Sequence, residues 1–143
     1  MVIPTKIVGI MKFSTRTTYG LRAMIKLAAN YNKAAVSLAH IAKKEKISQK
    51  YLERLFVALK KEKLVLSEKG ASGGYRLARD PKNIRIYDIV RVLEGEINPF
   101  HCVNDKGEII CSQKCHCGAT AILIKVQGAI NSTLQSMKLS DLL

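Results

Sequence analysis

The chain of 143 residues lacks the features that would place it in a membrane or carry it across one. It has no apolar run long enough to span a bilayer and no lipidation signal. Residues 1–10 are mildly apolar but lack the charged start, long apolar core and small-residue cleavage site of a secretion signal. We therefore expect a cytoplasmic protein with no membrane partner, whose thiols stay mostly reduced. Met11 resembles a natural start, so residues 1–10 are interpreted as an upstream extension.

The sequence also lacks the residue groupings of an enzyme. No substrate-binding motif or general-base arrangement is present, and Ser37, Ser48 and Ser112 do not stand in the setting of a nucleophile elbow. We therefore expect a protein without enzymatic activity.

Acidic residues are scarce in the first two thirds of the chain. Residues 1–91 contain 20 Lys and Arg but only 6 Asp and Glu, a balance of +14, whereas residues 92–143 contain 4 and 5, a balance of −1. A segment with this excess of positive charge favours a polyanionic partner, and nucleic acid is the most common one.

Cysteine is absent from all but one short stretch. The four cysteines are Cys102, Cys111, Cys115 and Cys117. Thiols gathered in a polar loop, beside His101 and His116, indicate a bound metal, a metal–sulfur cluster or a redox switch rather than core packing. His40 lies in the basic segment instead, and we expect no ligand role for it.

Capping serines and the helical spacing of apolar residues predict three helices in the basic segment, at about 15–30, 38–43 and 49–61. The last two are joined by the polar turn at 44–46, a spacing typical of a helix-turn-helix. The prediction is therefore a mainly α fold with a DNA-binding unit.

A glycine-rich hairpin follows these helices. Strand-like residues 64–67 and 75–77 flank Gly70, Gly73 and Gly74, in the place where a winged helix carries its wing. The sequence thus predicts a winged helix-turn-helix domain over residues 11–94 with a small β-wing.

Beyond the wing the sequence predicts an extended stretch at 84–86, a helix from 87 to about 93, a cysteine-rich loop over 95–118 and a last helix within 119–143. The last helix carries an apolar stripe, consisting of Ile122, Val126, Ala129, Ile130, Leu134 and Met137. Such a stripe suits either intramolecular packing or a dimer seam.

The first turns of the helix at 49–61 supply candidate base-reading residues, because only they can reach base edges in the major groove. The candidates are Ser48, Gln49, Lys50, Tyr51, Glu53 and Arg54. Gln49 can pair with adenine, and Lys50 or Arg54 with guanine or phosphate. Glu53 can accept a hydrogen bond from cytosine or orient Arg54, and a solvated helix face is the alternative interpretation.

The hairpin supplies a second set of candidates: Lys69, Gly70, Gly73, Gly74 and Arg76. A tip of small residues can enter the minor groove while a flanking cation contacts phosphate. The alternative is a plain tight hairpin whose glycines supply positive φ.

Three segments resemble the Rrf2 family of bacterial regulators, which includes IscR, NsrR and CymR. They are MKFSTRTTYGLRAM at 11–24, ISQKYLERLF at 47–56 and GASGGYRL at 70–77. The likeness runs from Met11 to the C-terminus. It implies a homodimeric winged-helix transcription regulator, repressor or activator, with a cysteine loop just before a long C-terminal dimerisation helix.

The resemblance also implies a ligand set. Iron–sulfur members carry three cysteines, the last two separated by five residues, and Cys111 and Cys117 keep that gap. Cys102, Cys111 and Cys117 are therefore the implied ligands of an iron–sulfur cluster, 2Fe-2S in preference to 4Fe-4S.

The fourth ligand of such a cluster departs from the family pattern. Thr120 stands where IscR has a histidine, and Thr18 stands at about the position of an NsrR aspartate. Cys115 is the first candidate for that place. His116, His101 or a group from the partner subunit follow it.

These observations predict a sequence-specific DNA-binding regulator that senses iron–sulfur or redox status and binds a pseudo-palindromic operator as a homodimer. A zinc site and a metal-free thiol switch of the CymR kind remain open for the sulfur chemistry. A redox protein and a metal-free partner-binding scaffold remain open for the function.

Overall fold

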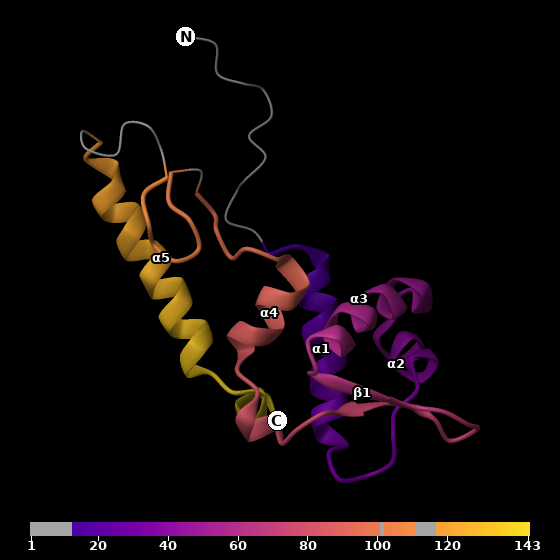
Figure 1. Ribbon diagram of the computed structural model, residues 1–143. Coiled ribbons are helices and arrows are strands. Elements are labelled where there is room, and N and C mark those ends of the chain that lie inside the picture. Colours follow the sequence, from indigo (N-terminus) through magenta and orange to yellow (C-terminus); the bar gives the residue numbers. More distant parts are fainter. Residues whose placement is uncertain (1–12, 101, 111–116) are drawn as a thin grey trace.

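The computed structural model describes residues 13–100, 102–110 and 117–143. Five α-helices and a two-stranded sheet follow one another along these residues (Figure 1). In chain order the elements are α1 (Thr15–Ala29), α2 (Leu38–Glu45), α3 (Gln49–Lys61), β1 (Val65–Glu68), β2 (Gly74–Leu77), the short 3₁₀ helix η1 (Pro81–Asn83), α4 (Ile86–Glu94), α5 (Ala119–Ser136) and η2 (Leu139–Leu142).

Serine caps set the starts of the first three helices, as the sequence predicts. The hydroxyl of Ser14 accepts a hydrogen bond from the amide of Arg16, and those of Ser37 and Ser48 cap α2 and α3 in the same way. Helix α2 continues to Glu45, two residues into the turn predicted at 44–46, and Lys46, whose φ of 54° is left-handed, caps it and turns the chain toward α3. The predicted helix-turn-helix is confirmed.

The wing is an antiparallel pair in which Val65 faces Leu77 and Glu68 faces Gly74. Its second strand is also bonded to the chain before α2, because Val36 and Tyr75 exchange backbone hydrogen bonds of 2.9 and 2.8 Å. A Cβ on Gly74 would overlap the carbonyl of Val36. Close backbone approach therefore requires this glycine, in addition to its φ of 150°.

One apolar core joins α1, α2, α3, the wing and α4, and we call residues 13–94 the head. The largest fully buried side chains of the head are Phe56, Met24, Leu27, Ile41, Leu52, Leu59, Leu64, Ile84 and Ile89. The ring of Phe56 packs edge-on against Tyr75 of the wing, with centroids 4.9 Å apart. The wing is thus fixed to the recognition helix through the core.

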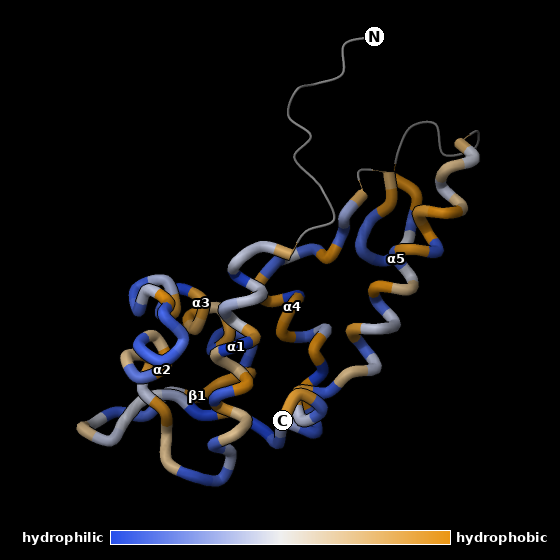
Figure 2. Tube along the Cα trace, turned by 180° about the vertical axis from the view of Figure 1, so that it is seen from behind, coloured by the Kyte–Doolittle hydropathy of each residue, from blue (hydrophilic) through white to orange (hydrophobic). Residues whose placement is uncertain are grey.

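Helix α5 stands along one side of the head, near α4 (Figure 1). The predicted apolar stripe is divided between two surroundings. Ile130, Leu134 and Met137 pack against the core, whereas Ile122 is 67% exposed and Ala129 is also exposed. Apolar residues recur along the whole helix in Figure 2, so periodicity could not tell which of them face inward.

The extended stretch predicted at 84–86 is confirmed for residues 84 and 85, whereas Ile86 already begins α4. The partner of this stretch is the C-terminal tail, which the sequence did not reveal. The amide of Leu139 donates to the carbonyl of Ile84 at 2.8 Å, and Arg85 bridges to Lys138. None of the helices in the described part of the chain is long and apolar enough to cross a membrane.

Candidate nucleic-acid interface and cysteine segment

The start of α3 is amphipathic in the way that a groove-reading helix requires. Its buried face consists of Leu52, Leu55, Phe56 and Leu59. Its outer face carries five of the six candidates in exposed positions: Ser48, Gln49, Lys50, Glu53 and Arg54. The structure thus brings the predicted base-reading residues together on one accessible surface.

The hydrogen bonds on this surface correct one expectation about Glu53. Its carboxylate accepts from the side-chain amide of Gln49 at 3.2 Å, whereas no hydrogen bond or ion pair joins it to Arg54 among the described residues. Gln49, not Arg54, is the side chain that Glu53 orients. Lys50 and Arg54 form no ion pair with an acid of the described chain, so their charges stay available to phosphate.

Tyr51, the sixth candidate, is half-buried and joins α3 to the start of α1. Its ring meets that of Tyr19 edge-on at 5.9 Å, and its hydroxyl lies 3.3 Å from the hydroxyl of Thr15. An open hollow of about 480 Å³ lies here, lined by Thr15, Tyr19, Ile47, Ser48, Lys50, Tyr51 and Arg54. Sequence reasoning missed Thr15 and Tyr19, because only the fold places the start of α1 beside the start of α3.

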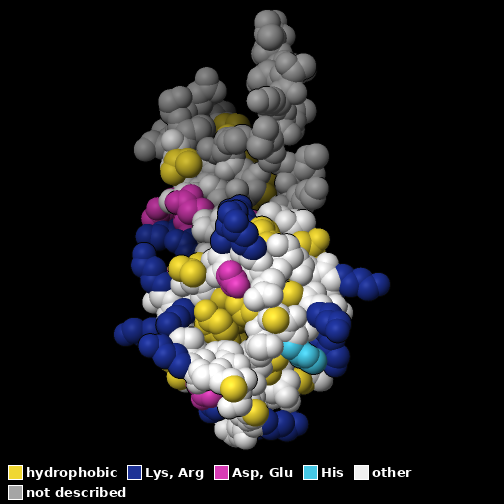
Figure 3. Space-filling view, turned by 90° about the vertical axis from the view of Figure 1, so that its right-hand side faces the viewer, with side chains coloured by type: hydrophobic (Ala, Val, Ile, Leu, Met, Phe, Trp, Pro, Cys, Tyr) yellow, Lys and Arg dark blue, Asp and Glu magenta, His cyan; other side chains and the backbone are white. Residues whose placement is uncertain are grey.

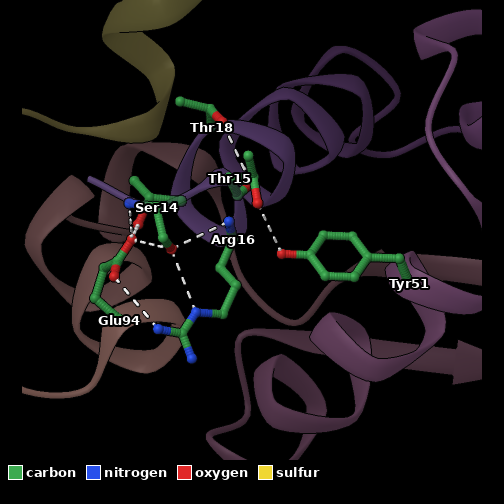
Figure 4. A network of polar contacts seen from close by, with 7 residues as sticks. Ser14, Thr15, Arg16, Thr18, Tyr51 and Glu94 are labelled. Atoms are coloured by element: carbon green, nitrogen blue, oxygen red, sulfur yellow. Dashed lines mark hydrogen bonds and ion pairs between the residues drawn. The ribbon is translucent and has the colours of Figure 1, made fainter. Parts of the chain in front are cut away.

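Glu94, the last residue of α4, fixes the start of α1 (Figure 4). Its Oε1 accepts hydrogen bonds from the Ser14 amide at 2.8 Å, the Ser14 hydroxyl at 2.6 Å and the Thr17 hydroxyl at 2.5 Å. Burial alone would raise the pKa of Glu94, but these hydrogen bonds and the charge of Arg16 outweigh it and lower the pKa below its usual value.

The wing candidates have unequal roles. Lys69 is exposed and unpaired among the described residues, whereas Arg76 forms a 2.5 Å ion pair with Glu68 across the hairpin. Gly70 has a φ of 107°, which favours glycine, and Gly73 lies so close to the Glu68 carbonyl that a Cβ would not fit. The hairpin itself therefore explains Gly70 and Gly73, the approach of Val36 explains Gly74, and Lys69 is the wing candidate whose charge no described acid neutralises.

A second open hollow, of about 440 Å³, separates the wing tip from the start of α2. Lys26, Lys44 and the exposed His40 contribute to its wall. Figure 3 looks at the side of the molecule on which α2, α3 and the wing lie, and Lys and Arg side chains surround much of that face. Positive charge thus borders the face on which the recognition helix and the wing lie.

The cysteine segment is described in part. Cys102 and Cys117 are free, half-buried thiols, while Cys111, Cys115, His101 and His116 lie outside the described residues. Within the described ranges, no group of three His, Cys, Asp or Glu side chains is placed to hold a metal ion.

Cys102 begins an ordered β-turn hairpin, and we call residues 102–110 the cysteine hairpin. The amide of Ile110 donates to the carbonyl of Cys102 at 2.9 Å, and Val103 bridges to Ile109. Asn104 closes the turn, because its side-chain oxygen accepts from the amides of Lys106 and Glu108.

Cys117 lies just before α5, and the side chain of Thr120 is hydrogen-bonded to its backbone. The Thr120 hydroxyl donates to the Cys117 carbonyl at 2.7 Å and is buried. This hydroxyl therefore stabilises the backbone at the start of α5 through its hydrogen bond.

A helix-turn-helix with a two-stranded wing and a cation-rich face defines a winged-helix DNA-binding protein. The chain belongs to the Rrf2 family of transcription regulators: the family model described as "Iron-dependent Transcriptional regulator" matches residues 13–143.

Among individual proteins, the chain is 37% identical to the HTH-type transcriptional regulator CymR of Bacillus subtilis, over 92% of this chain and 89% of that protein. The solved structure of that CymR, titled the global cysteine regulator, has a TM-score of 0.78 and covers 93% of this chain and 96% of its own.

Two further solved structures are similar. IscR of T. potens has 37% identity and a TM-score of 0.72, with coverage of 92% and 85%. The oxidized form of Staphylococcus aureus CymR has 33% identity and a TM-score of 0.70, with coverage of 90% and 92%. The chain is thus similar both to CymR and to IscR, and belonging to the family does not decide which of the two it resembles in function.

Proposed function

We propose that this protein is a cytoplasmic, sequence-specific DNA-binding regulator whose affinity for its operator depends on the state of its cysteines. The observation that carries the proposal is the pair of free, half-buried thiols, Cys102 and Cys117, in a segment attached to a head with an exposed cationic helix start. Free thiols that are partly accessible can bind metal or be oxidised, whereas fully buried ones are inert.

The head, within the predicted unit 11–94, would place the start of α3 in the major groove. Lys50 and Arg54 would contact guanine or phosphate, and Gln49 would be presented to a base by its bond to Glu53. Lys69 at the wing would reach the neighbouring minor groove or its phosphates.

A homodimer would contact DNA through two heads, and α5 has exposed apolar side chains suited to a dimer interface. Ile122 is 67% exposed, and Ile110 of the cysteine hairpin is also largely exposed. Covering such side chains would stabilise a dimer by removing apolar surface from water, and the two-fold axis would predict a pseudo-palindromic operator. Ile122→Glu should shift the dimer toward monomer in sedimentation velocity, whereas Lys125→Glu on the same helix should shift it less.

For the sulfur site we propose an iron–sulfur cluster, 2Fe-2S in preference to 4Fe-4S, held by Cys102, Cys111 and Cys117 with Cys115 as the fourth ligand. Thiolates are the donors that iron–sulfur clusters take, and two of the four are half-buried rather than sealed in a core. Thr120 and Thr18 are weak candidates for the fourth place, because a neutral hydroxyl is a poorer ligand for an iron–sulfur cluster than a thiolate, and both hydroxyls donate to backbone carbonyls, those of Cys117 and Thr15.

A metal-free thiol switch is the second candidate, and similarity to the CymR structures, one of them in an oxidized form, favours it. In that case two of the four thiols would form a disulfide, which removes two electrons and two protons from the protein.

Anaerobic purification, a visible spectrum and counts of iron and acid-labile sulfide separate the two candidates. A cluster predicts matched iron and sulfide with broad absorbance at about 400–460 nm, lost when Cys102, Cys111 and Cys117 are replaced by alanine. A colourless protein that takes up neither iron nor sulfide after anaerobic reconstitution would contradict the cluster. A reversible, oxidant-dependent change in DNA affinity in that colourless protein would then support the thiol switch.

A further inference from the structure

Two polar residues in the second half of α4, one turn apart, contact different parts of the molecule: one contacts the cysteine hairpin and the other the start of α1. Arg91 forms an ion pair with Asp105 of the cysteine hairpin, and Glu94 receives the hydrogen bonds of Ser14 and Thr17. Residues three apart on a helix lie on neighbouring positions of its surface. A single helical turn therefore separates the cysteine hairpin from the contacts at the start of α1.

On the hairpin side the contacts are directional and meet at a buried carboxylate, that of Asp105. Asp105 is only 7% exposed and lies three residues after Cys102 in the same hairpin. The side-chain amide of Asn131, from α5, donates to the Asp105 carbonyl at 2.8 Å. Gln127, which is fully buried, donates to the carbonyl of Ile97 at 2.6 Å. The hairpin and the chain leading to it are thus bonded to α4 and to α5.

On the head side the contacts reach the recognition helix. Ser14 and Thr17 are held by the carboxylate of Glu94, and Thr15, between them, shares a hydrogen bond with Tyr51 of α3 (Figure 4). Tyr51 lies in the first turn of α3, beside Lys50. A continuous series of contacts therefore runs from the segment that carries Cys102 to the surface that would read DNA.

We infer that Asp105, Arg91 and Glu94 are positioning residues that couple the cysteine hairpin to the start of α3 within one subunit. The inference rests on the proposed function and adds a route for its regulation. Metal binding or oxidation at Cys102 would displace Asp105 and break its ion pair with Arg91. The end of α4 would then shift, and with it the hydrogen bonds that Glu94 accepts at the start of α1. Coupling of this kind requires two arrangements of the contacts whose relative stability depends on the thiol state.

Hydrogen exchange on the full-length, reduced, metal-free protein tests the coupling without any cluster. Asp105→Asn removes the charge that holds Arg91, and Arg91 is exposed enough to be solvated instead. We expect amide exchange to rise several-fold in the hairpin and also around residues 14–18 and 48–51. Asp88→Asn is the matched control, because Asp88 lies near the other end of α4 and pairs with Arg85, the residue just before that helix. A rise confined to residues 97–110 would overturn the inference.

DNA affinity supplies the functional readout, with a duplex selected by the wild-type protein from a random-sequence library as the probe. Asp105→Asn should move the Kd of the reduced, metal-free protein toward the value that the wild-type protein reaches with iron and sulfide, or with oxidant, and should cut the further change caused by these treatments at least about threefold. Asp88→Asn should keep the whole change. An undiminished change in Asp105→Asn would overturn the inference.

The two proposals fail in different ways. A wild-type protein whose affinity ignores every thiol state contradicts the sensing function. The hydrogen-exchange comparison between Asp105→Asn and Asp88→Asn would still decide whether the hairpin and the start of α3 are coupled.

Discussion

The head and the region that follows it bury different kinds of side chain. Apart from Ile97, Val103 and Leu139, every buried apolar residue of the described chain lies within the head. Besides those three apolar side chains, the region after residue 94 buries the polar side chains of Asp105, Thr120 and Gln127, each engaged in a hydrogen bond or an ion pair. Apolar packing thus predominates in the head, whereas the region after it combines apolar contacts with a small number of directional polar ones.

The difference in packing suits the different functions proposed for the two regions, DNA reading by the head and a response to the thiol state by the region after it. Apolar packing is spread over many contacts, and one arrangement fills the space best, so the reading surface keeps its shape. A few hydrogen bonds can be exchanged for others at a net cost of about 1 kcal/mol each, so a region built on them can rearrange when a ligand or oxidant acts on it. The proposed sensing region therefore lies where rearrangement costs least.

The largest effect is expected from opening the core of the head. Phe56→Ala should lower the free energy of unfolding by about 3–5 kcal/mol, because the fully buried ring would leave a cavity beside Tyr75. Urea denaturation followed by circular dichroism measures the loss. Val57→Ala, at the adjacent and 67% exposed position, should change stability by less than about 0.5 kcal/mol. Similar losses in the two variants would contradict the assignment of the core.

A smaller loss is expected from the polar contacts of α5. Gln127→Ala should lower the free energy of unfolding by about 1–3 kcal/mol, because it leaves the carbonyl of Ile97 without its donor in a buried place. Gln135→Ala, on an exposed position of the same helix, is the control. If Gln127→Ala lowered the free energy of unfolding as much as Phe56→Ala, the proposed difference in packing between the two regions would be contradicted.

On the reading surface, Lys50→Ala should weaken DNA binding by roughly tenfold and lower the salt slope of log K by about 1, because one phosphate contact is lost. Fluorescence anisotropy at several salt concentrations measures both. Lys61→Ala, at the far end of α3, should retain nearly all of the wild-type affinity and slope. An equal effect of the two changes would point to a diffuse charge effect rather than to reading by the start of α3.

The smallest effect concerns acidity at the junction between α4 and α1. The pKa of Glu94 is lower in the folded protein than its ordinary value, so its contribution to stability is present above that ordinary value and is lost as pH falls through the folded pKa. Glu94→Gln should therefore flatten the acid side of the stability profile measured by urea denaturation. Glu96→Gln, an exposed neighbour, should leave the profile as in wild type, and an unchanged profile in Glu94→Gln would refute the assignment.

The sequence predicts local structure better than it predicts partners. Ser14, Ser37 and Ser48 mark helix starts because a cap is a contact between near neighbours, and the wing is marked by its glycines for the same reason. The contacts of Glu94 with Ser14 span 80 residues, and nothing at either position reveals the other. The apolar stripe of α5 was predicted to share one face, yet the buried Thr120 and Gln127 are polar, because hydrogen bonding rather than hydropathy selects the inward side there.

The candidate site follows the same rule. Clustering along the chain makes the α3 residues and the cysteines candidates, since these sets are local in sequence. Thr15 and Tyr19 were missed because they approach α3 only in the folded head. The ion pair between Arg91 and Asp105 was missed as well, since neither side chain departs from what a solvent-exposed helix or loop would carry.

The most direct test of the central claim is the Kd for a selected DNA duplex, measured for the reduced, metal-free protein and again after anaerobic reconstitution with iron and sulfide or treatment with oxidant. Our account predicts a change of about 5- to 150-fold in at least one treatment, and its loss when Cys102, Cys111 and Cys117 are replaced by alanine. Equal affinities in all states, or a change that persists without these cysteines, would contradict it.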